Sequence, residues 1–270
     1  MVSKLKGRVL VISGSDPSGG AGLQGDIKTI TSLGGFSTNA ITAITNQDTK
    51  KVYDIYDLNS LFVAKQIKTV LNDIGSDSIK IGMLSNPEII KCVSLTLSKY
   101  AKNIPIVLDP VMSSQTGYKL IKDNYKENLL SRLIPKCLII TPNLPEAEIL
   151  TGKKIRSVSD MIESIDSLRK LGAEAVLLKG GHLEGSHLTD LLITKEKYFR
   201  YDSNKIDTSS THGTGCALSS AIATGLAQSL SLEDSVKRAR KFVYEAIKLA
   251  PGYGRGSGPL NHCLNFSRLD

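Results

Sequence analysis

Several chemical signatures are missing from this sequence of 270 residues. Its four cysteines contain no Cys-x-x-Cys pair, which argues against a structural zinc site and a disulfide framework. The four histidines show no metal-ligand spacing and are expected to be loop residues. No apolar stretch approaches the ~20 residues of a membrane span, and the run at residues 9–12 ends too early for a signal peptide. We therefore expect a cytoplasmic protein.

Motifs of several functional classes are also absent. The serines lack a Gly-x-Ser-x-Gly elbow, so a hydrolase triad is unsupported, and the first glycine-rich loop lacks the dinucleotide-binding Gly-x-Gly-x-x-Gly order. The net charge of +8 suits anionic ligands, but a solvated basic surface explains it equally well. Because the basic residues are scattered, we expect no nucleic-acid binding. Without a repeat or linker, residues 1–270 are expected to form a single domain.

Short apolar segments alternate with helical patterns along the chain. Strands are expected at residues 9–12, 36–44, 79–81, 104–108, 138–140 and 175–178, and an antiparallel hairpin at 191–201. Helices are expected around residues 63–74, from a capping box at Asp160 to a stop at Gly172, and after Ser231. This alternation predicts an α/β fold with a mostly parallel sheet and helices on both faces.

Polar and glycine-rich segments follow the expected strands. They lie at residues 14–22, 82–84, 109–112, 141–146 and 179–182. In an open parallel sheet the ligand lies beyond the carboxyl ends of the strands. The sequence therefore predicts that these segments meet at one ligand-binding crevice.

A second glycine-rich turn, Thr-His-Gly-Thr-Gly-Cys at residues 211–216, precedes a run of small and apolar residues. Its backbone N–H groups and the dipole of a following helix would favour a phosphate. The competing interpretation is a glycine turn before a buried helix. Lys179 follows an apolar strand, where it would either meet a phosphate as a point charge or pair with an acid in the crevice.

Three acidic residues are candidates for ligand contacts. Asp109 and Glu146 follow strands and would hold Mg²⁺ through water, or else cap helices. Asp26 follows the first glycine-rich loop and would accept a hydrogen bond from a ligand, or else start a helix. Gln47 follows another strand, where a ligand contact and ordinary turn chemistry are equally good explanations.

Taken together, these motifs closely resemble the hydroxymethylpyrimidine/phosphomethylpyrimidine kinase family, in order from Val9 to about Pro259. The resemblance implies a ribokinase-like fold, commonly dimeric. It also implies ATP-dependent phosphorylation of 4-amino-5-hydroxymethyl-2-methylpyrimidine to its monophosphate and then its diphosphate, in thiamine biosynthesis or salvage.

The resemblance also implies roles for individual residues. The pyrimidine pocket would be lined by Gly14, Asp26, Gln47, Met83 and Val111. Phosphates would be bound by Asn143, Lys179, Thr211, Gly213, Thr214 and Gly215, with Mg²⁺ near Asp109 and Glu146. Cys216 and Lys179 would be the catalytic residues.

One position separates this chain from the wider superfamily. Sugar kinases of that superfamily have an aspartate base where this chain has Cys216. A cysteine resembles the pyrimidine kinases and some pyridoxal kinases, so a pyridoxine/pyridoxal kinase is the alternative. A binding protein without catalysis is disfavoured because Lys179, Glu146 and Cys216 are all present. The polar loop at residues 113–117 is expected to be either a flap over the substrate or a plain surface loop.

Overall fold

A mixed nine-stranded sheet forms the centre of the computed structural model, which describes residues 6–113, 120 and 124–264. The strands are β1 (Arg8–Ser15), β2 (Phe36–Gln47), β3 (Val52–Asp57), β4 (Ser78–Ile81), β5 (Ile106–Leu108), β6 (Ile139–Ile140), β7 (Ala175–Lys179), β8 (His187–Thr194) and β9 (Tyr198–Asn204). Their order is β3-β2-β1-β4-β5-β6-β7-β8-β9. Strands β2, β1 and β4 to β7 are parallel, which confirms the mostly parallel sheet.

Antiparallel strands form both edges of this sheet. β8 and β9 form the expected hairpin, and β8 pairs with β7. β3, which pairs with the end of β2, was not expected from the sequence. Its side chains are mostly exposed, so it lacks the apolar run that reveals the inner strands. β5 is shorter than expected because Pro105, which lacks a backbone N–H, precedes it.

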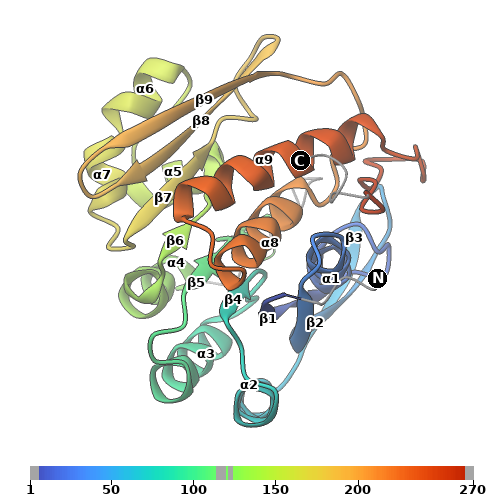
Figure 1. Cartoon of the computed structure of the whole chain (residues 1–270), viewed down its shortest axis with the longest axis vertical. Helices are drawn as coiled ribbons and strands as arrows, with labels where there is room; N and C mark the ends of the chain where they lie inside the picture. The colour runs from blue at the N-terminus through green and yellow to red at the C-terminus, as the bar shows by residue number, and fades with distance from the viewer. Residues whose placement is uncertain (1–5, 114–119, 121–123, 265–270) are drawn as a thin grey trace.

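Helices pack on both faces of the sheet (Figure 1). They are α1 (Gly22–Ser32), α2 (Ser60–Asp73), α3 (Pro87–Tyr100), α4 (Tyr125–Asn128), α5 (Leu144–Thr151), α6 (Val158–Glu163), α7 (Ile165–Arg169), α8 (Thr214–Ala227) and α9 (Leu232–Lys248). Ser231 caps α9 as expected. The cap predicted at Asp160 is wrong, because Ser157 is the N-cap and Asp160 completes its capping box. No helix in the described part of the chain has the length and hydrophobicity of a membrane span.

Alternate side chains of the central strands enter two separate cores. On β1, Leu10 and Ile12 pack into the core that contains Val63 and Ile67 of α2 and residues of α3. Val9 and Val11 pack into the opposite core, against residues of α1, α8 and α9. The inner strands are therefore apolar on both faces, which explains why their sequences read as continuous aliphatic runs.

The order of strands creates a crevice at the carboxyl end of β1. From β1 the chain moves to β2 on one side, whereas β4 occupies the other side. Such a change of direction leaves room beyond the strand ends, where ligands bind in open α/β sheets. Gly14 at the end of β1 and Met83 after β4 meet there: a Cβ atom on Gly14 would lie 3.2 Å from the Met83 Sδ.

A fully buried ion pair lies below this crevice. The Lys80 Nζ of β4 is 2.7 Å from Asp26 Oδ2 of α1, and both side chains are inaccessible to solvent. Ser220 of α8 donates a 2.7 Å hydrogen bond to the other carboxylate oxygen. Burial alone would lower the pKa of Lys80, but the nearby carboxylate of Asp26 raises it, so the ammonium group stays charged. One carboxylate thus connects the sheet with two helices.

We predict that Lys80→Met destabilises the protein by about 3–5 kcal/mol, since it leaves Asp26 buried without its counter-charge. Urea unfolding measures the loss. The double variant Lys80→Met/Asp26→Leu should recover much of it, because no isolated charge remains. The control is Arg8→Met, which removes the half-exposed 2.6 Å pair with Asp77 and should cost no more than about 1 kcal/mol. Equal losses for the two single variants would contradict the prediction.

Candidate active site

A cavity of about 770 Å³ opens beyond the carboxyl ends of the parallel strands. This volume is within the range that holds a small molecule. All the expected site residues but one line it: Gly14, Gln47, Met83, Asp109, Val111, Asn143, Glu146, Lys179, Thr211, Gly213, Thr214, Gly215 and Cys216. Residues from seven separate segments of the chain therefore meet at one site.

Asp26 is the exception. Its carboxylate is fully buried and is engaged by Lys80 and Ser220, and it is not among the residues that line the cavity. The prediction that Asp26 lines the pyrimidine pocket is therefore corrected. The competing expectation of an acid that starts a helix is not met either, because Asp26 lies beyond the first turn of α1.

One end of the cavity has apolar walls and a few polar groups. Met83 belongs to a small apolar cluster with Ala43 and Val52, and Val111 packs against it. Gln47, at the end of β2, lies in the lining beside these groups. An apolar wall with one amide suits a flat ring that carries polar atoms on its edge.

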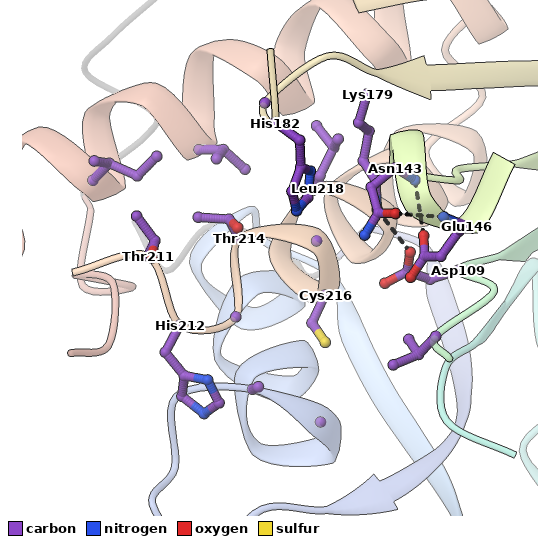
Figure 2. A pocket seen from close by; sticks show the side chains of 18 of the residues that line it. Asp109, Asn143, Glu146, Lys179, His182, Thr211, His212, Thr214, Cys216 and Leu218 are labelled. Atoms are coloured by element: carbon purple, nitrogen blue, oxygen red, sulfur yellow. Dashed lines mark hydrogen bonds and ion pairs between the residues drawn. The ribbon is translucent and has the colours of Figure 1, made fainter. Parts of the chain in front are cut away.

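Charged groups gather near the middle of the cavity (Figure 2). The Lys179 Nζ is 3.0 Å from Asp109 Oδ1, which also accepts a 3.1 Å hydrogen bond from Thr141. Burial would lower the pKa of Lys179, but Asp109 and Glu146 raise it overall, so this lysine is cationic. The expected pairing of Lys179 with an acid is therefore confirmed, whereas its contact with a phosphate stays a prediction.

Glu146 caps a helix, which was one of the two interpretations of this residue. With Asn143 it forms the capping box of α5, in which its Oε2 accepts from the Asn143 N–H at 2.8 Å. Its side chain nevertheless lines the cavity. Burial, reinforced by the charge of Asp109, raises the pKa of Glu146 to about 7, although Lys179 opposes that shift.

The donor set near Asp109 and Glu146 fits a hydrated Mg²⁺ ion but not an all-protein metal cage. The described residues include no group of three or more His, Cys, Asp or Glu side chains that would hold a metal. Mg²⁺ typically keeps several waters and binds one or two carboxylates together with substrate phosphates. Two carboxylates beside a glycine-rich turn that is expected to hold a phosphate would meet that requirement.

Residues 211–216, called here the phosphate turn, lead into α8. Gly213 is the N-cap at φ +87°, and no side chain caps this helix. The Thr214 N–H donates to the Thr211 carbonyl oxygen at 3.3 Å, but no side chain caps the N–H groups that follow, and the helix dipole favours negative charge there. A Cβ on Gly215 would lie 3.3 Å from the Lys179 Nζ, so the lysine approaches this turn closely. The phosphate turn and a cation face the same space.

Cys216 lies in the first turn of α8, partly buried at the cavity wall. Burial raises the pKa of its thiol to about 12, while Lys80 and a hydrogen bond from the Gly22 backbone oppose that rise. The sequence did not decide the direction of this shift, because the helix dipole and bound phosphate act oppositely. Burial therefore opposes the thiolate form, which Cys216 would need in order to accept a proton.

Several lining residues escaped the sequence analysis. The histidines showed no metal spacing, yet His212 lines the cavity, and its Nε2 lies 2.8 Å from Asp16 Oδ2 of the first glycine-rich loop. Helix α9 was recognised only by its apolar stripe, but its Arg240 and Tyr244 also line the cavity. Arg240 is held there by a 2.8 Å bond to Asp190. In the sequence, the only indication that His212 belongs to the site was its position in the glycine-rich turn at residues 211–216.

The loop at residues 113–117 was expected to be a flap or a plain surface loop. Apart from Ser113, it lies outside the described residues.

Comparison with known proteins agrees with this geometry. The family model described as phosphomethylpyrimidine kinase matches residues 16–261. A hydroxymethylpyrimidine/phosphomethylpyrimidine kinase of Bacillus subtilis is 40% identical over 97% of this chain and 98% of its own. The thiamine biosynthesis bifunctional protein ThiED of Geobacter sulfurreducens is 43% identical over 96% of this chain, which spans 53% of that longer protein.

This chain belongs to the phosphomethylpyrimidine kinase family.

Comparison with solved structures identifies the fold of this chain. The phosphomethylpyrimidine kinase of Clostridium difficile 630 superposes with a TM-score of 0.79 at 44% identity, covering 90% of this chain and all of that one. A Staphylococcus aureus pyridoxal kinase in complex with AMP-PCP and pyridoxal gives 0.87 at 33% identity, covering 98% and 96%. The expected ribokinase-like fold is confirmed, and the chain is a phosphotransferase.

We predict that Cys216→Ala lowers turnover of the pyrimidine alcohol by about 100-fold or more, since about 100-fold is the lower end of the range for losing a proton acceptor, with little change in substrate affinity. Cys216→Asp should retain more activity than Cys216→Ala, because aspartate supplies a base at the same place. Steady-state ADP release measures both variants.

The competing account assigns most of the catalysis to the backbone N–H groups of the phosphate turn. Under that account Cys216→Ala stays within a few-fold of the parent enzyme, and the base assignment must be withdrawn. Alkylation gives an independent check on the thiol. At pH 8, iodoacetamide should modify the exposed Cys263 well before Cys216, whose raised pKa leaves little thiolate.

Proposed function

We propose that this kinase transfers a phosphoryl group from ATP to 4-amino-5-hydroxymethyl-2-methylpyrimidine, and then a second one to the resulting monophosphate, on the route to thiamine. The observation that carries the proposal is the assembly of Lys179, the phosphate turn and Cys216 beside an apolar, amide-bearing pocket. The names of the relatives agree with both steps.

The cavity has two ends that suit the two substrates. The pyrimidine ring would lie between Met83 and Val111, with the Gln47 amide at its edge. The nucleotide would enter from the end lined by α9, where Arg240 and Tyr244 lie. The phosphate turn lies between them. Transfer of a phosphoryl group needs mainly alignment and neutralisation of charge, which the α8 N-terminus and Lys179 would supply.

Mg²⁺ would be held through water near Asp109 and Glu146. When bound, it would neutralise charge on the phosphates. Lys179 would then exchange part of its contact with Asp109 for a phosphate oxygen, since it is already cationic and faces the cavity. Asn143 would remain fixed by its capping box, with its side chain directed at the same space.

We also propose a homodimer and a cytoplasmic location. Exposed apolar side chains gather on β2, β3 and the start of α2, namely Ile44, Tyr53, Tyr56, Leu61 and Phe62, as is common at an interface between copies. Light scattering would test the dimer. All four cysteines are free, which suits a reducing compartment.

A coupled assay of ADP release tests the activity. The purified enzyme is offered the pyrimidine alcohol, its monophosphate and pyridoxal side by side, with Mg²⁺ and ATP. The proposal requires ADP release with both pyrimidines. Turnover with pyridoxal alone would replace it with a pyridoxal kinase, and no turnover with any of the three would leave the chain a binding protein.

We predict that Gln47→Met weakens use of the pyrimidine alcohol by about 1–3 kcal/mol in kcat/KM, the cost of leaving buried polar groups unpaired. An amide can donate to a ring nitrogen and accept from the exocyclic amine, and methionine can do neither. Pyridoxal should suffer less. Equal losses for both substrates would remove Gln47 as the discriminating residue.

The two transfers should also depend differently on Cys216. An alcohol must lose its proton during transfer, whereas a phosphate monoester, whose second pKa is about 6, is largely deprotonated at pH 7.5. We therefore predict that Cys216→Ala slows the first transfer at least about ten-fold more than the second, within the usual contribution of a general base. Single-turnover kinetics with each acceptor measures this ratio, and equal losses would show that the thiol acts in some other way.

A further inference from the structure

The phosphate turn is attached to the first glycine-rich loop through one histidine. His212 Nε2 lies 2.8 Å from Asp16 Oδ2, and both side chains are largely buried. Hydrogen bonds lower the pKa of Asp16 well below its usual range, despite its burial, so its carboxylate is ionised and only accepts. The proton is therefore on Nε2, and the ring donates it to Asp16. In Figure 2, His212 lies on the opposite side of the turn from Lys179.

Asp16 organises the loop that His212 contacts. Its Oδ1 accepts from the Ser18 N–H at 2.8 Å and from the Ser18 hydroxyl at 2.7 Å, and its Oδ2 accepts from the Ala21 N–H at 2.8 Å. A hydrogen bond from the Gln47 side chain also helps to lower the pKa of Asp16. The Asp16 carboxylate thus interacts both with Gln47, the residue predicted to bind the pyrimidine ring, and with His212 of the phosphate turn.

The backbone around His212 is also fixed. Its N–H donates to the carbonyl oxygen of Gly258 at 3.0 Å, and it forms an isolated bridge with Pro259. The next residue, Gly213, approaches the first loop so closely that a Cβ there would lie 1.9 Å from the Gly20 carbonyl oxygen. Because Gly213 begins the helix whose N–H groups face the cavity, a shift of His212 would move those groups directly.

We propose that His212 is a positioning residue for phosphoryl transfer, which through Asp16 fixes the phosphate turn relative to the pyrimidine end of the cavity. It touches neither substrate in this role. The inference rests on the proposed function, because the two ends of the cavity are assigned by it. A displacement of about 1 Å between reacting groups can cost about 100-fold in rate, so even a small shift of the turn would matter.

Three variants test the role of His212. His212→Leu removes the donor, and His212→Gln offers an amide N–H that can reach Asp16. His187→Leu is the matched control, since His187 is exposed at the start of β8 and does not line the cavity. For each variant, kcat and KM for the pyrimidine alcohol and for ATP are measured by ADP release, together with the melting temperature.

We expect His212→Leu to lower kcat by about 10- to 100-fold while KM for ATP changes little, the pattern of an interaction that matters in the transition state. The kcat of His212→Gln should be about ten-fold higher than that of His212→Leu, because one hydrogen bond to a charged group is worth about that much. His187→Leu should behave like the parent. If His212→Leu is insoluble, His212→Asn, whose shorter amide falls short of Asp16, takes its place.

Two results would overturn the proposal. One is a His212→Leu enzyme whose kcat stays close to that of the parent. The other is a loss of kcat that follows the loss of folded protein on heating and that His212→Gln does not restore, because that is the behaviour of a purely structural residue. If the parent enzyme phosphorylates pyridoxal in place of the pyrimidines, the proposed function fails, and the same variants still test His212 with pyridoxal as the acceptor.

Discussion

The buried ion pair between Lys80 and Asp26 holds together the three elements whose ends form the active site. Lys80 belongs to β4, Asp26 to α1, and Ser220 of α8 completes the contacts of the carboxylate. A charge buried at this depth is tolerated only while its partners stay in place, so the relative positions of the sheet and two helices are restricted. Because Ser220 belongs to α8, the same contact restricts the position of the phosphate turn at the start of that helix.

Above that pair, the charged groups of the site already have partners within the protein. Lys179 pairs with Asp109, Asp16 accepts a hydrogen bond from His212, and the charge of Glu146 is reduced by its raised pKa. Anionic phosphates and a divalent cation would arrive with opposite charges and exchange partners with groups already present. Little reorganisation is then required during transfer, which is the property that makes electrostatic catalysis effective.

The overall fold does not distinguish a pyrimidine from a pyridoxal substrate. The pyridoxal kinase of Staphylococcus aureus superposes on this chain at least as well as the phosphomethylpyrimidine kinase of Clostridium difficile, although the latter is more similar in sequence. Substrate choice therefore depends on a few side chains in the pocket rather than on the scaffold. Gln47, in contact with Asp16 and beside an apolar wall, is the position where such a choice would be made.

The sequence by itself determined the parallel strands, the crevice at their carboxyl ends and all but one of the site residues expected there, because aliphatic runs and glycine-rich turns are local patterns. It did not reveal β3, whose exposed side chains carry little pattern, or the lining residues of α9, which sit in an ordinary amphipathic helix. Asp26 shows the reason most clearly. From the sequence it was a polar residue beside a ligand-binding loop, but its burial against Lys80, 54 positions away, turned it inward. The thiol of Cys216 and the pairing of His212 with Asp16 were likewise decided only by tertiary structure, since burial and long-range contacts set the charge of a group and no local pattern records them.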